Sequence, residues 1–108
     1  MLHIYPVMVE TVQSMKPLID EIKKSDKDLA NQLKRAVTSV LLNTSEGAYS
    51  HGENVRARFH NALGSAAESR SCLQVAELWG YIDPIDPGLA DKLDRVIATL
   101  HRLAKRRA

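Results

Sequence analysis

The chain has 108 residues, of which 44% are hydrophobic, 26% charged and 5% aromatic, and its formal net charge is +2. This length suits a single domain over residues 1–108, and the few aromatic residues, glycines and prolines favour helices over a β-sandwich. No apolar run approaches the ~20 residues of a membrane span, and the N-terminus lacks the pattern of a signal peptide. The one cysteine, Cys72, cannot form an intrachain disulfide. We therefore expect an all-α, cytoplasmic protein that does not contact a membrane.

The first predicted helix covers residues 7–24. Pro6 suits the start of this helix, where a missing N–H leaves no hydrogen bond unmade. Pro17 lies inside the helix and removes a hydrogen bond there, so we expect one helix kinked near Met15. The alternative is a break, with the helix proper beginning near Pro17. Residues 1–5 are expected to lie outside the bundle. The apolar stripe comprises Val12, Met15, Leu18, Ile19 and Ile22.

The second predicted helix covers residues 26–46. Ser25 and Asp28 resemble a capping box, in which the serine caps the helix and the carboxylate reaches back. Gly47 is available for the left-handed conformation that ends many helices, although the helix could continue a turn further through Ala48. One face carries an apolar stripe of Leu29, Leu33, Ala36, Val37, Val40, Thr44 and Ala48.

The third predicted helix covers residues 53–79. Residues 50–53 form a second capping-box pattern before it, and Gly80 is expected to cap its C-terminus. Its main stripe comprises Val55, Phe59, Ala62, Leu63, Ala66 and Leu73.

The fourth predicted helix covers residues 87–105, and Asp86 followed by Pro87 is a strong start signal for it. Four helices with short connections predict an antiparallel up-down-up-down four-helix bundle. The side chains expected at the centre of its core are Leu33, Val37, Leu63 and Leu100.

Two of the predicted helices carry apolar residues away from their core stripe. On the second helix these are Leu41 and Leu42. A helix with two apolar-leaning faces is usually buried on both, which favours a homo-oligomer. Scattered surface hydrophobes on a monomer are the alternative. On the third helix, a second line of residues lies away from the core stripe and comprises Asn61, Ser65, Glu68, Cys72, Val75 and Trp79.

Two blocks of sequence within about residues 29–82 carry a family resemblance. The first block is Gln32-Leu33-Lys34-Arg35-Ala36, then Ser39, then Asn43-Thr44-Ser45-Glu46-Gly47. The second block is Gly64-Ser65 with Glu68, followed by Gly80-Tyr81-Ile82. They resemble the QLxRA–S–NxAEG and GSxxE–LGYI signatures of the bacterial four-helix-bundle proteins first noticed as products of intervening sequences in large-subunit ribosomal RNA genes. The chain departs from this pattern at Ser45 and at Ala48-Tyr49.

The resemblance implies a four-helix bundle that assembles into a ring of subunits, with a pentamer favoured. The family has no established catalytic activity. A related branch, the accessory proteins of diversity-generating retroelements, is a basic pentameric barrel that works with a reverse transcriptase and nucleic acid.

Arg35, Glu46 and Glu68 are polar residues that could fix the packing of helices. Arg35 and Glu46 share one line on the second helix with Ser39 and Leu42, facing away from the core stripe. An arginine paired with Glu46 or Glu68 across helices or subunits would fix their register. A binding or catalytic role is the alternative. The predicted structural and interface residues are Arg35, Leu41, Leu42, Glu46, Gly47, Glu68 and Trp79.

The motifs that could carry catalysis or bind a metal are incomplete. His51 and Glu53 match the first half of a zinc deaminase signature, but no PCxxC motif follows and Cys72 stands alone. Arg95 and His101 have the spacing of a ribonuclease family, yet positions six apart on one helix diverge by about 120°. We therefore expect no enzyme activity, no metal and no cofactor.

Basic residues gather at the C-terminus: residues 91–108 hold six basic and two acidic residues, whereas the rest of the chain holds nine basic and eleven acidic ones. On the fourth predicted helix, Arg95, Arg102 and Arg106 form a basic ridge on the side opposite its apolar residues. This ridge is either a nucleic-acid contact or a solvated face whose cations suit a helix C-terminus. The predicted function is a non-enzymatic, homo-oligomeric scaffold or adapter, and the alternative is a nucleic-acid-binding accessory protein.

Overall fold

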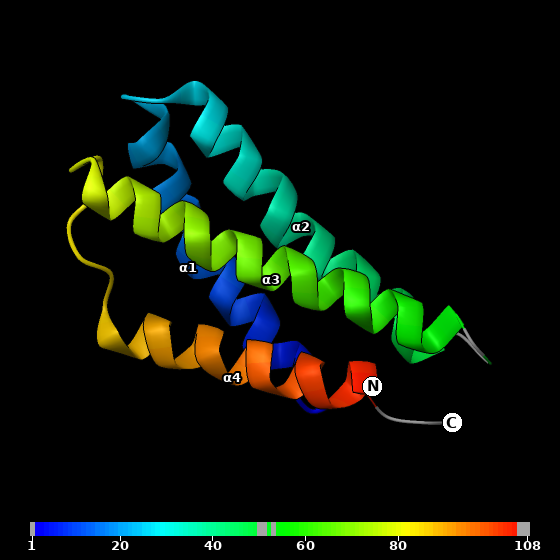
Figure 1. The fold of residues 1–108 in the computed structure, drawn as a ribbon. Helices are drawn as coiled ribbons and strands as arrows, with labels where there is room; N and C mark the ends of the chain where they lie inside the picture. Colours follow the sequence, from blue (N-terminus) through cyan, green and yellow to red (C-terminus); the bar gives the residue numbers. More distant parts are fainter. Residues whose placement is uncertain (1, 50–51, 53, 106–108) are drawn as a thin grey trace.

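The computed structural model describes residues 2–49, 52 and 54–105, and its helices form one antiparallel bundle (Figure 1). Each helix packs against the next in the chain, and the first also packs against the last. The bundle measures 43 × 25 × 19 Å along its principal axes. This arrangement confirms the predicted all-α, up-down-up-down four-helix bundle. The helices are α1 (Tyr5–Lys23), α2 (Lys27–Tyr49), α3 (Asn54–Leu78) and α4 (Pro87–Lys105).

Helix α1 runs without a break through Pro17, so the alternative of a helix that begins near this proline is wrong. Pro17 is tolerated because it lies on the exposed side of the helix. The expectation that residues 1–5 lie outside the bundle is also wrong. Ile4 is buried and packs, together with Met8, in the same core cluster as Val40.

Asp26, rather than Ser25, caps the N-terminus of α2. The Leu29 N–H donates a hydrogen bond of 2.9 Å to Asp26 Oδ1, and the Ala30 N–H donates one of 3.1 Å to the Asp26 carbonyl. The carboxylate satisfies one free backbone donor and places a negative charge at the positive end of the helix dipole. The predicted capping box of Ser25 with Asp28 is therefore wrong, and the cap lies one residue later, at Asp26.

Gly47 does not end α2, because the helix continues to Tyr49. This glycine is buried inside the helix, and a Cβ built on it would lie 3.0 Å from both Cε1 and Cζ of Phe59. Gly47 therefore allows α2 and α3 to approach each other closely, and it does not form a left-handed turn. The capping-box residues 50, 51 and 53 lie outside the described residues.

Gly80 ends α3 as predicted, with a φ of 76°. The Tyr81 N–H donates to the Ala76 carbonyl at 2.9 Å, and the Gly80 N–H donates to the Glu77 carbonyl at 3.0 Å. These two bonds form a Schellman motif, which satisfies carbonyls that the end of the helix leaves free. The Ile85 N–H donates to Glu77 Oε1 at 3.1 Å, which fastens the following loop to α3.

The core forms two clusters along the length of the bundle. Leu33 lies at the centre of the first cluster and Leu100 at the centre of the second, both with no exposed surface. Leu63 is only partly buried, which corrects its predicted central place, because it packs at the edge of the second cluster. The first cluster includes Met15, Ile22, Leu33, Val37, Cys72, Leu73 and Leu93, and the second includes Ile4, Met8, Val40, Phe59, Val96 and Leu100.

Candidate interaction surfaces

Small polar side chains join α2 to α3 near the middle of their contact. Ser65 Oγ donates to Ser39 Oγ at 2.7 Å, and Asn43 Nδ2 donates to the same hydroxyl oxygen at 2.9 Å. Serine side chains let two helices approach closely, and their hydroxyls satisfy one another there. This contact fixes the register of the hairpin formed by α2 and α3.

Glu46 and Glu68 lie on either side of this serine contact, and each pairs across the two helices. Arg58 Nη1 lies 3.0 Å from Glu46 Oε2, and Gln32 Nε2 donates to Glu68 Oε2 at 3.2 Å. Both carboxylates therefore hold α2 against α3 within one chain. Glu46 and Glu68 pair between helices, but their partners are Arg58 and Gln32 rather than the predicted Arg35.

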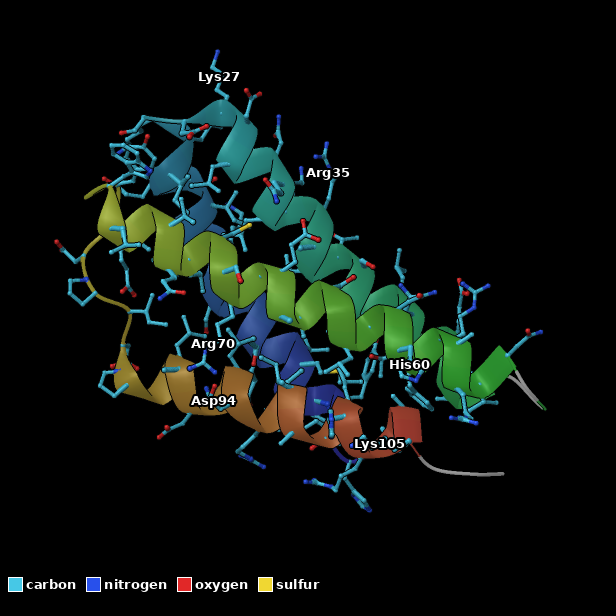
Figure 2. The ribbon with its side chains drawn as sticks, in the orientation of Figure 1. Lys27, Arg35, His60, Arg70, Asp94 and Lys105 are labelled. Carbon is cyan, nitrogen blue, oxygen red and sulfur yellow. The ribbon has the colours of Figure 1, made fainter. Side chains whose placement is uncertain are left out.

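Arg35 is exposed and projects outward from α2 (Figure 2). Among the described residues it forms neither a hydrogen bond nor an ion pair. Arg35 lies on the same line of α2 as Glu46 but eleven residues earlier, ~16 Å along the helix axis, and Gln32 instead donates to Glu68. A pairing of Arg35 with another subunit remains a prediction.

All large apolar side chains that the described residues expose lie on α2, on α3 or directly after α3. Leu42 is 59% exposed and Trp79 is 72% exposed. Leu41 is instead partly buried and packs against the second core cluster, so its predicted place on an outer surface is wrong. We call this surface the α2–α3 outer face; its exposed apolar residues are Leu42, Tyr49, Val75, Leu78 and Trp79.

The part of α3 on this outer face carries little charge. Between Ala57 and Leu78, the exposed positions on this side are mainly small or uncharged, with Arg58 and Glu68 as exceptions. The outward sides of α1 and α4 instead carry charged residues at regular intervals, such as Glu10, Lys16 and Asp91. The α2–α3 outer face is therefore the side of the bundle best suited to a further protein contact. Its small exposed residues are Ala57, Gly64, Ala67 and Ser71.

Cys72 packs in the first core cluster with only 3% of its surface exposed. Burial raises the pKa of its thiol, and the nearby carboxylate of Glu68 raises it further. A protonated, buried thiol is a poor nucleophile and a poor metal ligand. Cys72 is therefore a small packing residue of the core, which corrects its predicted place on the second line of the third helix.

No group of three or more His, Cys, Asp or Glu residues in the described part of the chain is arranged to hold a metal ion. None of the described helices combines the length and hydrophobicity that a bilayer crossing requires.

A family model described as 23S rRNA-intervening sequence protein matches residues 2–102. The chain belongs to this family. Searches of curated proteins and of solved structures gave no match. The match to the 23S rRNA-intervening sequence protein family covers α1, α2, α3 and most of α4, and with them the whole α2–α3 outer face.

Two residues of the predicted basic ridge, Arg95 and Arg102, are exposed on α4 of this family member. Arg102 Nη2 donates to Thr99 Oγ1 at 3.3 Å, one turn earlier on the same helix. The third, Arg106, lies outside the described residues.

One further cation near the end of α4, Arg56 of α3, was not predicted from the sequence. Its Nε donates to the carbonyl of Ala104, near the end of α4, at 3.4 Å. The two residues are 48 positions apart in the chain. Helical periodicity relates only residues of one helix, so no sequence pattern pointed to this neighbour.

Proposed function

We propose that this member of the 23S rRNA-intervening sequence protein family is a non-enzymatic scaffold or adapter that assembles with copies of itself through the α2–α3 outer face. One observation supports this proposal above the others: the exposed large apolar side chains of the described residues gather on one side of the bundle. The resemblance of the sequence to a family of ring-forming bundles makes a pentamer the arrangement that we propose.

The energetic argument rests on the size of these side chains. Burying a Leu or a Trp that water otherwise covers contributes ~1.5–3 kcal/mol. Leu42 and Trp79 lie near opposite ends of the α2–α3 hairpin, so a contact that covers both uses much of its length. Arg35 lies between them and offers a guanidinium that can pair with a carboxylate of a second copy. We propose the cytoplasm as the compartment, because a lone buried thiol suits reducing conditions.

The test is the mass of the purified protein by light scattering. The proposal expects a multiple of 12.0 kDa, five times this mass for a ring of five. Leu42→Glu places a carboxylate on the outer face without touching the core and should lower the mass to that of one chain. Gln13→Glu, which adds the same charge on the exposed side of α1, is the matched control and should not change the mass. A wild-type mass of 12.0 kDa would contradict the proposal.

A second candidate function is nucleic-acid binding through the basic ridge, with Arg95, Arg102 and Arg106 as contacts. The observation that favours it is the absence of an acidic partner for Arg95 or Arg102 among the described residues. Affinity purification with and without nuclease treatment separates the two functions, because nuclease removes partners that nucleic acid holds and leaves a self-assembled scaffold intact.

A further inference from the structure

Two helix halves that lie side by side in the bundle contain no acidic residue. They are residues 54–67 of α3 and residues 95–105 of α4. The hydrogen bond from Arg56 to the carbonyl of Ala104 joins them at one end. The ion pair of Arg70 with Asp94 marks the other end, where acidic residues resume (Figure 2). We call the exposed surface of these two halves around the α3–α4 contact, which carries Arg56, Arg95, Arg102 and Lys105, the carboxylate-free face.

The cations of this face have no neutralising partner. Four exposed cations, Arg56, Arg95, Arg102 and Lys105, form no ion pair with another described residue. Two carboxylates of the neighbouring helices α1 and α2, Glu10 and Glu46, already pair with other cations. Lys92 Nζ lies 3.4 Å from Glu10, and Arg58 lies 3.0 Å from Glu46. Among the described residues, no carboxylate therefore pairs with these four cations. Two exposed histidines, His60 and His101, lie within it.

The length of the face fits a run of phosphates. The eleven residues from Arg95 to Lys105 span ~15 Å along a helix axis. One strand of a duplex advances ~3.4 Å per phosphate, so this length corresponds to about four phosphates. The four cations match this number.

The face offers phosphate contacts but, within the described residues, no exposed Phe, Tyr or Trp side chain on which bases can stack. The aromatic side chains that the described residues expose, Tyr49 and Trp79, lie on the α2–α3 outer face. Proteins that bind bases of single strands use aromatic platforms, whereas phosphate contacts need only cations and donors. We propose that the carboxylate-free face binds the phosphate backbone of a nucleic acid without reading its bases, an inference that rests on the second function proposed above.

The structural consequence is that binding and self-assembly use different surfaces. Leu42 and Trp79 lie on the α2–α3 outer face, whereas Arg102 and Lys105 lie on α4. A ring built through the α2–α3 outer face would then repeat the carboxylate-free face once per subunit. Phosphate affinity grows with the number of contacts, so assembly would strengthen binding.

The experiment is a titration of fluorescein-labelled single-stranded RNA and duplex DNA by anisotropy over a series of salt concentrations. With about four phosphates contacted per chain, affinity should fall ~50-fold for single-stranded RNA and ~150-fold for duplex DNA between 50 and 200 mM salt. The double variant Arg102→Gln/Lys105→Gln should reduce the slope of log affinity against log salt by about 1.5–2. The control variant Lys23→Gln/Lys27→Gln removes two exposed cations from the opposite end of the bundle and should leave the slope unchanged.

The outcomes separate the function from the surface. If the wild type binds neither probe at low salt, nucleic-acid binding fails as a function, and the inference fails with it. If the wild type binds but both double variants lose affinity equally, the function stands and this face is the wrong surface. The inference is supported if the affinity does not depend on the sequence of the probe and if only the Arg102/Lys105 variant reduces the slope of log affinity against log salt. If polyglutamate displaces the labelled probes as effectively as unlabelled RNA, the inference is overturned, and the face binds an acidic protein instead. Light scattering on the same samples reports self-assembly independently.

Discussion

Gly47 of α2 lies directly against the ring of Phe59 on α3, so that a Cβ at position 47 would come within 3.0 Å of two ring carbons. Both residues are buried, and the ring packs in the second core cluster. Because the α2–α3 contact is the most extensive in the bundle, this approach affects the hairpin that carries the proposed assembly surface.

Replacing Gly47 with alanine should therefore destabilise the fold. The added methyl group must displace a buried ring, and such overpacking costs ~1–3 kcal/mol. The control is Gly64→Ala, because Gly64 lies on the exposed side of α3 with no atom within 4 Å of an added Cβ. That change should instead stabilise by ~0.5–1 kcal/mol, since alanine is the better helix former. Urea denaturation of both variants measures the difference, and equal effects would contradict the close approach.

Thr44 provides a second prediction, because its buried Oγ1 has no hydrogen-bond partner among the described residues. Thr44→Val keeps the shape of the side chain and removes the unsatisfied hydroxyl, so the free energy of unfolding should rise by ~1 kcal/mol. Thr11→Val is the matched control, because Thr11 is also buried but donates to the Val7 carbonyl at 2.7 Å. It should leave stability unchanged or lower it. Thermal unfolding checks both variants, and a loss of stability for Thr44→Val would contradict the prediction.

The fold was predictable because each helix repeats its apolar residues at helical spacing and ends at a recognisable signal. Gly80 and Asp86 mark the α3–α4 connection in the sequence, and the structure uses both there. The cap of α2 was misplaced by one residue, because Ser25 and Asp26 are both good capping residues and a local pattern does not distinguish them.

The surfaces were harder to predict because helix α2 packs against two neighbours. Leu41 falls off the stripe defined by Leu33, yet it is partly buried because the helix buries a wider arc than one partner requires. Leu42, one position later, turns to the outside. Arg56 was missed for a different reason, since only the folded chain brings it to Ala104.

The thiol of Cys72 provides the last prediction. Burial, with a smaller contribution from Glu68, raises its pKa above the ordinary value of 9.0. In the folded protein the thiol should therefore react slowly with a disulfide reagent at neutral pH and quickly once urea exposes it. Because the pKa of the thiol is higher in the folded than in the unfolded chain, the unfolded chain releases this proton at a lower pH. The free energy of unfolding is therefore unaffected below the unfolded-state pKa and falls as the pH rises above it. Stability should thus fall from neutral pH to about pH 10 more steeply in the wild type than in Cys72→Ala. Urea midpoints at both pH values measure this difference, and identical slopes for the two proteins would show that the thiol keeps its ordinary pKa in the core.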